Sequence, residues 1–360
     1  LIAAYFENYA QAFDLKSRIH FQTGVSSVER HDGSWRVVLD SGKQEQFDAL
    51  VVANGHHWDA RWPEPAFPGQ FAGLELHSHE YVSPTEPYDL QGKRVVVVGM
   101  GNSAMDIACE LGHPGAAARV FIAARRGAWI LPKYAFGKPI DQTGAMPRFL
   151  PLRVRQALAG ALYRIVVGRM SDYGLPEPDH PLGSAHPTIS SDFLTRVGSG
   201  DVIPKQNLSE LCGERVRFAD GSEEAVDAII YATGYKVSFP FFEPSFLSAK
   251  DNQLPLYLRI FHPDHENLFF IGLCQPLGAI MPLSEAQAKL VARYLSGGYA
   301  LPTQAAMREH TERAERRMRA RYVSSPRHTM QVDYDDYLAE LARETRLGER
   351  RASKARALVY

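Results

Sequence analysis

The chain has 360 residues, of which 45% are hydrophobic and 22% are charged, and its formal net charge is −1. These proportions are typical of a globular protein with a buried core, and the length suits one large or two ordinary domains. The near balance of charge argues against a nucleic-acid partner, which would require a basic excess. No apolar run is long enough to cross a membrane. We therefore expect a cytoplasmic protein without a membrane partner.

The three cysteines stand far apart, at Cys109, Cys212 and Cys274. No CxxC pair is present, so the sequence indicates neither a redox dithiol nor a zinc knuckle, and we expect no metal site. Nothing points to disulfides, which fits a reducing compartment.

The N-terminal part is expected to contain one helix and a group of short strands. The first 13 residues have the pattern of an amphipathic helix, and the largely apolar run 48–53 predicts a buried strand that ends at Asn54-Gly55. The proline-rich passage 62–87 is interpreted as a linker between two units. Further short strands are predicted at 19–21, 25–30 and 35–39.

The rest of the chain alternates predicted strands and helices. Ser284 and Gln287 have the spacing of a capping box, which predicts a helix that begins there and ends at Gly297. Residues 131–191 are mostly irregular and rich in proline, and residues 343–360 are expected to be a disordered tail. Strands are predicted at 94–99, 119–124, 216–218 and 227–232, and helices at 104–111 and 152–167.

An internal repeat organises the chain. Residues 48–55 and 227–234 both consist of Asp-Ala, three apolar residues, Ala, a small polar residue and Gly, and each segment follows a hairpin turn. Two such hairpins can match by chance, but the agreement extends through the whole of both segments. We interpret the chain as two related nucleotide-binding units.

The fold predicted from this repeat is α/β, with two Rossmann-like dinucleotide-binding domains. A glycine-rich loop at Gly99 lies well upstream of the second repeat. The corresponding loop of the first unit would lie before Leu1, so the first domain is expected to lack its N-terminal βαβ portion. The predicted divisions are a first domain over 1–89 that continues over 236–342, and a second domain over 90–235.

Residues 99–104 fit the pattern G-x-G-x-x-A between a predicted strand and a predicted helix. Gly99 permits the tight turn, Gly101 lets the backbone approach a pyrophosphate, and Ala104 lets helix and strand pack closely. The backbone at Asn102 and Ser103 and the positive end of the helix dipole would then bind the anion. An ordinary strand-to-helix turn is the alternative.

The end of the next strand discriminates between NADPH and NADH. A carboxylate that binds the ribose hydroxyls is expected about 20 residues after the loop, but the chain has Ala123-Ala124-Arg125-Arg126 there. Two guanidinium groups can bind a 2′-phosphate. Arg125 and Arg126 therefore predict NADPH, unless they belong to a solvated loop.

A further motif, F-x-G-x-x-x-H-x-x-x-Y, precedes the Gly99 loop. It consists of Phe71, Gly73, His77 and Tyr81. Together with the Gly99 loop, this motif resembles the flavin-containing monooxygenase family. Baeyer–Villiger relatives have a similar motif that ends in Trp, so the tyrosine points to oxygenation of heteroatoms. Other residues that match the family are Arg125 to Pro132, Thr233, Gly234, Tyr235 and Gln275.

The resemblance implies one domain for FAD and one for NADPH. In that family NADPH reduces FAD, and a C4a-hydroperoxyflavin then transfers one oxygen atom of O₂ to a small-molecule tertiary amine or sulfide, as in N,N-dimethylaniline monooxygenation. The flavin performs the chemistry, so no catalytic side chain is assigned, and His77 and Tyr81 are interpreted as architectural. A homodimer is one expected assembly. Positions expected near FAD are Val25, Asn54, Gly55 and Gln275.

One departure from the family limits the flavin prediction. The family's first glycine-rich loop and its active-site Asn would lie before Leu1. Alternatives therefore stay open: an inactive NADP-binding paralogue or fragment, and a Baeyer–Villiger or N-hydroxylating monooxygenase. A pyridine-nucleotide disulfide oxidoreductase has the same two-unit architecture, but the lack of CxxC argues against it.

Overall fold

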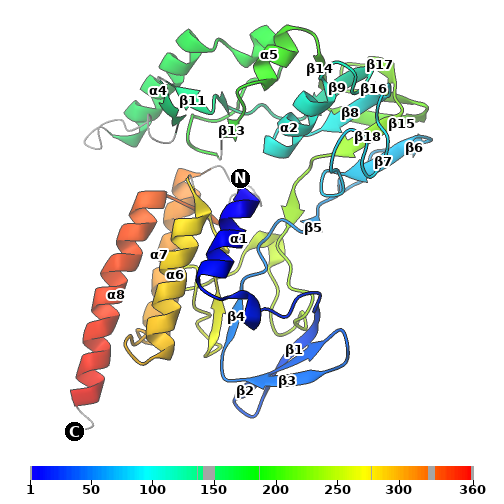
Figure 1. The fold of residues 1–360 in the computed structure, drawn as a ribbon. Coiled ribbons are helices and arrows are strands. Elements are labelled where there is room, and N and C mark those ends of the chain that lie inside the picture. Colours follow the sequence, from blue (N-terminus) through cyan, green and yellow to red (C-terminus); the bar gives the residue numbers. More distant parts are fainter. Residues whose placement is uncertain are drawn as a thin grey trace.

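The computed structural model describes residues 2–135, 137–140, 151–185, 187–276, 278–322 and 329–357. Figure 1 shows two bodies of structure. The upper body, here the upper unit, comes from the middle of the chain, drawn in cyan to green. The lower body, here the lower unit, combines the N-terminal strands with the C-terminal helices. This arrangement has the overall organisation that the sequence predicts, with a second unit inserted into the first.

A parallel five-stranded sheet forms the centre of the upper unit, in the order β14-β9-β8-β18-β7. Val95 and Val97 of β8 pack with helix α2 (Asn102–Leu111), whereas Val96 and Val98 pack with a second sheet on the opposite face. Since both faces are covered, all four valines are buried, as expected of a parallel strand. The strands are β7 (Leu74–His77), β8 (Arg94–Val98), β9 (Arg119–Ala124), β14 (Val202–Gln206) and β18 (Ala228–Tyr231).

The second sheet of the upper unit has the order β17-β16-β15-β6. Its strands are β6 (Gly69–Phe71), β15 (Leu208–Gly213), β16 (Arg215–Phe218) and β17 (Glu223–Ala225). The remaining upper elements are β10 (Ile130–Leu131), β11 (Tyr134–Ala135), β12 (Lys138–Pro139), α4 (Leu152–Val166), η2 (Met170–Tyr173), β13 (Thr188–Ile189) and α5 (Phe193–Gly198). Strand β10 pairs in parallel with β13, and the two form a separate two-stranded sheet.

The lower unit begins with helix α1 (Ile2–Ala12), the short η1 (Lys16–Arg18) and an antiparallel meander of three strands. Strand β4 (Leu50–Val52) follows this meander and pairs in parallel with β20 (Leu268–Phe270). The meander strands are β1 (Val25–His31), β2 (Ser34–Leu39) and β3 (Gln44–Phe47). The later elements are η3 (Lys250–Asn252), β21 (Gln275–Pro276), α6 (Ile280–Leu295), α7 (Gln304–Arg321), β22 (Gln331–Val332) and α8 (Tyr334–Ala357).

The two repeated sequence segments adopt the same local structure. In the lower unit the β1-β2-β3 meander leads into β4, and in the upper unit the β15-β16-β17 meander leads into β18. Both return strands pair in parallel with a neighbour, β4 with β20 and β18 with β8. The predicted internal repeat is therefore confirmed as two related structural units.

The predicted element boundaries need four corrections. Residues 19–21 form no strand, because they lie in the turn that follows η1. Helix α6 begins at Ile280 and not at Ser284. Strands β6 and β7 pair in the upper unit, so the predicted division at residue 89 is placed too late. The predicted disordered tail is helical over 343–357, as part of α8, and residues 358–360 lie outside the described residues.

Some predictions concern segments that are only partly described. Of the stretch 131–191, residues 136, 141–150 and 186 lie outside the described residues. The described remainder contains α4, η2 and the two-residue strands β11, β12 and β13, together with the end of β10. Among the described helices, none combines the length and apolarity needed to cross a bilayer.

A bidentate ion pair joins the start of β8 to the start of β18. One carboxylate oxygen of Asp227 accepts hydrogen bonds from the backbone N–H (2.7 Å) and Nε (3.0 Å) of Arg94, and the other accepts one from Nη2 (2.7 Å). These hydrogen bonds lower the pKa of Asp227 to about 2. Asp48, at the equivalent position of the first repeat, is exposed.

We predict that Asp227→Asn lowers the free energy of unfolding at pH 7 by roughly 1–2 kcal/mol, because the pair is only partly screened by solvent. The carboxylate stabilises the fold fully above its unfolded pKa of about 4, and this contribution is lost as the pH falls through about 2. Urea denaturation across this pH window should show the difference from wild type shrinking. Asp48→Asn is the control, and equal effects of the two variants would contradict the prediction.

Candidate nucleotide-binding site

The glycine-rich loop begins where β8 ends. Gly99 has φ +140°, and its N–H donates to the Ala123 carbonyl at 2.9 Å. A Cβ atom on Gly99 would stand 2.5 Å from the carbonyl oxygen of Ala232, the residue that follows β18. Any side chain would therefore separate the loop from β18, and only glycine satisfies both the conformation and the contact.

The N-terminus of α2 is open to an anion. Gly101 is the N-cap residue, with φ −88° and ψ 178°, and no side chain caps the first turn. The turn contains no acidic residue, and Ser103 is exposed. Ala104 is fully buried against the sheet, which holds the helix close to β8. The free N–H groups and the helix dipole can therefore bind a phosphate group here.

Two side-chain hydrogen bonds fix the loop from the β13 side. Thr188 Oγ1 donates to the Met100 carbonyl at 2.9 Å, and Asn102 Oδ1 accepts from the Ile189 N–H at 2.8 Å. The Asn102 side chain thus positions the loop, a role that its place in the motif did not predict. Thr188 is buried and lies far from the loop in sequence, so no local sequence pattern predicts the contact.

The arginine pair lies directly after β9, and both side chains are exposed. Arg126 Nε stands 3.5 Å from Asp179 Oδ2, whereas Arg125 forms no ion pair with any described residue. The pKa of Asp179 is lowered, first by a hydrogen bond with His180 and also by the charge of Arg126. The two arginines are therefore unequal: Arg125 is free to bind a phosphate, and Arg126 already faces a carboxylate.

The loop after the arginines is held by a close backbone approach. A Cβ atom on Gly127 would stand 2.1 Å from the Pro176 carbonyl oxygen, and Trp129 Nε1 donates to the His180 carbonyl at 2.8 Å. Both contacts attach this loop to residues 176–180, which carry Asp179. No local sequence pattern predicts this attachment, since the two segments lie about fifty residues apart.

The residues of the motif Phe71, Gly73, His77 and Tyr81 make packing and hydrogen-bond contacts that link elements of the upper unit. Phe71 ends β6, and a Cβ on Gly73 would stand 2.5 Å from the Asp227 carbonyl oxygen. Tyr81 OH donates to Glu110 Oε2 at 3.0 Å, which attaches the motif to α2. Burial and this carboxylate raise the pKa of Tyr81, so the phenol stays protonated. The tyrosine holds α2 in place and keeps its proton at neutral pH.

His77 ends β7 and is fully buried. Its Nδ1 accepts from the His79 N–H at 3.1 Å, and its Nε2 lies toward the Gly234 backbone without a well-aligned hydrogen bond. Burial lowers the pKa of His77, so the ring is neutral at pH 7. Its ring contacts Trp62 and Tyr235, with centroids 5.8 and 5.4 Å away.

The junction between the units is a pair of two-residue strands, β5 (Asp59–Ala60) and β19 (Tyr235–Lys236). Thr233 Oγ1 donates to the Arg61 carbonyl, and the Arg61 N–H donates to the Gly234 carbonyl at 2.9 Å. Gly234 has φ +87°, which lets the chain turn from β18 into the junction. The residues Thr233, Gly234 and Tyr235 therefore link the nucleotide loop to the lower unit.

The positions predicted to lie near FAD all belong to the lower unit. Asn54 and Gly55 follow the carboxyl end of β4, and Gln275 lies in β21 after the carboxyl end of β20. Because β4 and β20 are parallel, these residues share one edge of the sheet, where open α/β sheets bind ligands. Val25 lies apart from them, at the first position of β1. The edge fits a nucleotide, and the individual contacts stay predictions.

Gln287 has a role that the predicted capping box did not include. It is fully buried in α6, its Oε1 accepts from the Gly272 N–H at 2.8 Å, and its Nε2 donates to Tyr337 OH at 2.6 Å. The tyrosine donates in turn to the Leu258 carbonyl at 2.6 Å. This chain of hydrogen bonds fixes the end of β20 against α6 and α8. Apart from the polarity of Gln287, nothing in the sequence predicts these hydrogen bonds.

Comparisons with known proteins agree with this organisation. A model of the family "Flavin-binding monooxygenase-like" matches residues 1–349. The chain is 39% identical over 360 residues to human flavin-containing monooxygenase 5 and 38% identical over 366 residues to human flavin-containing monooxygenase 2. The matches cover 95% and 94% of this chain and 66% of each relative, so the chain spans slightly less than two thirds of their length.

Solved structures give the same grouping. The S-allyl-L-cysteine S-oxygenase of Allium sativum is 26% identical with a TM-score of 0.65, and the match covers 99% of this chain and 70% of that one. A cyclohexanone monooxygenase with bound ε-caprolactone has a TM-score of 0.72 at 18% identity, covering 96% and 82%, and shares the fold. The fold and the glycine-rich loop define a class of enzymes that depend on a flavin and a pyridine nucleotide. Within that class, the chain belongs to the flavin-containing monooxygenase family.

We predict that Gly99→Ala costs roughly 1–3 kcal/mol of stability, because alanine disfavours φ +140° and its Cβ would collide with Ala232. Chemical denaturation measures the loss. Gly115→Ala is the matched control, since Gly115 has φ +85° but nothing within 4 Å of the added Cβ. The control should lose only the backbone contribution of about 1 kcal/mol, and equal losses would show that the contact with Ala232 is unimportant.

Proposed function

We propose that the chain functions as an NADPH-dependent flavin monooxygenase that inserts one oxygen atom from O₂ into a nucleophilic nitrogen or sulfur of a small molecule. The observation that carries the proposal is the open N-terminus of α2, followed after β9 by Arg125 and Arg126, in a member of this family. The loop supplies the phosphate site, and the arginines supply the specificity for NADPH.

The NADPH assignment is supported by the charges at the end of β9. No carboxylate follows the strand, so the ribose hydroxyls that NADH would present find no acceptor of the usual kind there. Arg125 is exposed and lacks an ion-pair partner among the described residues, so it can donate two parallel hydrogen bonds to a 2′-phosphate. Arg126 can contribute once a phosphate competes with Asp179.

FAD is the second cofactor of the proposal. Structures similar to this chain include a monooxygenase complex with FAD and NADP, at 18% identity and a TM-score of 0.73. When bound, the flavin would accept reducing equivalents from NADPH and activate O₂. The edge at Asn54, Gly55 and Gln275 is the place where the lower unit would hold it. No side chain is needed as a general acid or base, and His77 and Tyr81 keep their positions as neutral groups.

The substrate class is proposed to be tertiary amines or sulfides. The S-oxygenase of Allium sativum supports sulfur oxygenation, since it matches nearly the whole chain. Tyr81 at the end of the motif favours the same reaction. The cyclohexanone monooxygenases share only 16–18% identity and support the fold alone, so ketone oxygenation is the second candidate. A homodimer and a cytoplasmic location stay predictions, which gel filtration and cell fractionation would test.

We expect Arg125→Ala to weaken NADPH binding about tenfold or more and to leave NADH binding unchanged, because only NADPH carries the 2′-phosphate. Arg126→Ala should have a smaller effect, since Asp179 already neutralises part of its charge. Asp179→Asn should tighten NADPH binding for the same reason. Titration calorimetry with both nucleotides measures these changes.

Arg119→Ala is the control for this series, because Arg119 is an exposed arginine at the opposite end of β9. It should change the affinity for neither nucleotide. If Arg125→Ala weakens NADPH and NADH equally, the arginine binds something other than the 2′-phosphate, and the NADPH assignment is wrong.

The activity itself is tested by incubating the purified chain with FAD, removing free flavin by gel filtration, and recording the visible spectrum. We expect a retained flavin and NADPH-dependent formation of N-oxide or S-oxide from a tertiary amine and a sulfide. Ester formation from a ketone would favour the Baeyer–Villiger candidate. A colourless protein that binds NADPH and forms no product would identify the chain as an inactive NADP-binding protein and refute the proposed activity of this chain.

A further inference from the structure

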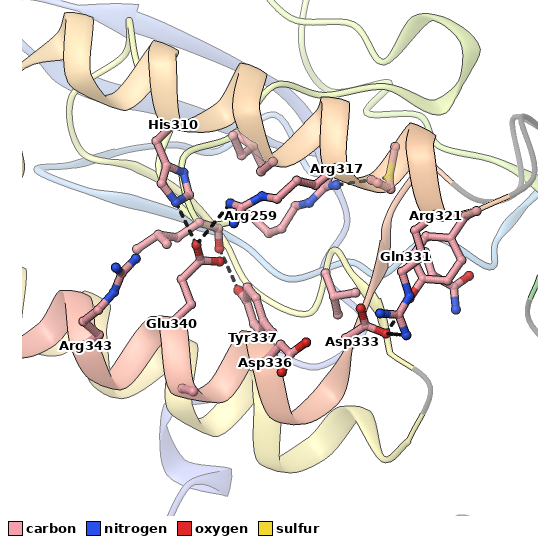
Figure 2. A pocket seen from close by; sticks show the side chains of 17 residues that line it. Arg259, His310, Arg317, Arg321, Gln331, Asp333, Asp336, Tyr337, Glu340 and Arg343 are labelled. Carbon is pink, nitrogen blue, oxygen red and sulfur yellow. Dashed lines mark hydrogen bonds and ion pairs between the residues drawn. The ribbon is translucent and has the colours of Figure 1, made fainter. Parts of the chain in front are cut away.

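A pocket of about 500 Å³ lies in the lower unit, away from the Gly99 loop. Helices α7 and α8 form its two sides, and residues 256–259 and β22 close it. Figure 2 shows that basic side chains from both helices extend into the space between them. The charged residues that line it are Arg259, Arg317, Arg321, Arg343, Asp333, Asp336 and Glu340, together with His310.

Arg259 is the central cation of this pocket. Leu258 and Arg259 have φ +54° and +59°, a left-handed conformation that costs energy in two successive non-glycine residues. The Arg259 Nη2 atom reaches only the Met318 sulfur, at 3.5 Å, and no described carboxylate lies within ion-pair distance. Burial lowers the pKa of Arg259. A strained backbone thus presents a half-buried guanidinium that has no ion-pair partner among the described residues.

Two of the three carboxylates of the pocket, Glu340 and Asp333, are already paired with other side chains. Glu340 Oε1 lies 2.9 Å from His310 Nε2 and 3.7 Å from Arg317 Nη2. Asp333 Oδ1 lies 2.7 Å from Arg321 Nη2 and accepts the Tyr322 hydroxyl. With His310 counted as neutral, four arginines face three carboxylates, so the lining carries one unit of excess positive charge. The pocket is therefore suited to a single negative charge.

Gln331 provides an independent sign of a ligand. The residue is 2% exposed, and neither the amide nitrogen nor the amide oxygen has a hydrogen-bond partner among the described residues. The backbone of Gln331 is fixed by the pairing of β22 with β21, so the side chain cannot move far from the pocket. Buried polar groups nearly always have a hydrogen-bond partner. An amide that lines a pocket without such a partner therefore indicates a ligand that would supply a donor and an acceptor.

We propose that this pocket binds a small organic carboxylate, with Arg259 as the counter-ion of the carboxylate and Gln331 as a hydrogen-bond partner of the same molecule. A guanidinium matches a carboxylate in a planar, bidentate geometry. The volume suits a metabolite-sized ligand. The lining includes neither the Gly99 loop nor Asn54, Gly55 or Gln275, although Gln331 lies beside Gln275 through the pairing of β22 with β21. The proposal does not depend on the monooxygenase activity.

Thermal denaturation of the full chain at constant ionic strength tests this directly, with acetate, lactate and inorganic phosphate as probes and chloride as the reference. At a hundredfold excess over the dissociation constant, a carboxylate should raise the melting temperature by roughly 3 °C or more over chloride. Phosphate should give the smaller shift. A larger shift with phosphate, or no carboxylate shift beyond chloride, would overturn the proposal.

Two variants separate ligand binding from a structural role. Arg259→Met should abolish the carboxylate shift and melt no lower than wild type in chloride, since it removes a half-buried charge that has no ion-pair partner among the described residues. Gln331→Leu should reduce the shift. Arg313→Met is the matched control, because Arg313 lies on the exposed side of α7 and pairs with Glu309; it should keep the full shift. A shift that persists in Arg259→Met, or a large loss of melting temperature in that variant without ligand, would refute the assigned site.

Discussion

The contact of Gly99 with the Ala232 carbonyl is the constraint on which the site depends. It brings the end of β8 against the end of β18 at a distance that excludes any Cβ atom. The phosphate-binding loop leaves β8 at this point, and Thr233, Gly234 and Tyr235 leave β18 toward the lower unit. One backbone contact therefore places the glycine-rich loop beside the junction between the units.

Histidine and aromatic rings pack at the junction between the units. The β5–β19 pair carries the connection, and the rings of His57, His77 and His79 surround Tyr235 with centroids 5.2–5.7 Å away. Burial lowers the pKa of His56, beside this cluster, to about 4 and also lowers the pKa of His77. At neutral pH the His56 and His77 rings therefore carry no charge. Packing, backbone hydrogen bonds and the β5–β19 pair, in which Asp59 lies opposite Lys236, hold the junction.

Sequence patterns predicted what depends on local geometry. The repeat, the parallel strand at 94–98 and the Gly99 loop were all predicted because each follows from the spacing of neighbouring residues. The Asn102–Ile189 bond, the Thr188–Met100 bond and the Arg126–Asp179 pair join residues fifty or more positions apart, and local patterns contain no such information. The helix start at Ser284 was wrong because Gln287 hydrogen-bonds to Gly272 and Tyr337 instead of capping the helix.

The measurement that tests the account most directly is the affinity of the unaltered chain for NADPH and for NADH, by titration calorimetry at one salt concentration. An open helix N-terminus binds the pyrophosphate of both nucleotides, whereas the arginine after β9 can distinguish them only through the 2′-phosphate. The account predicts that NADPH binds about tenfold or more tightly than NADH, as expected for one charge-assisted contact. Equal affinities, or no binding of either nucleotide, would contradict it.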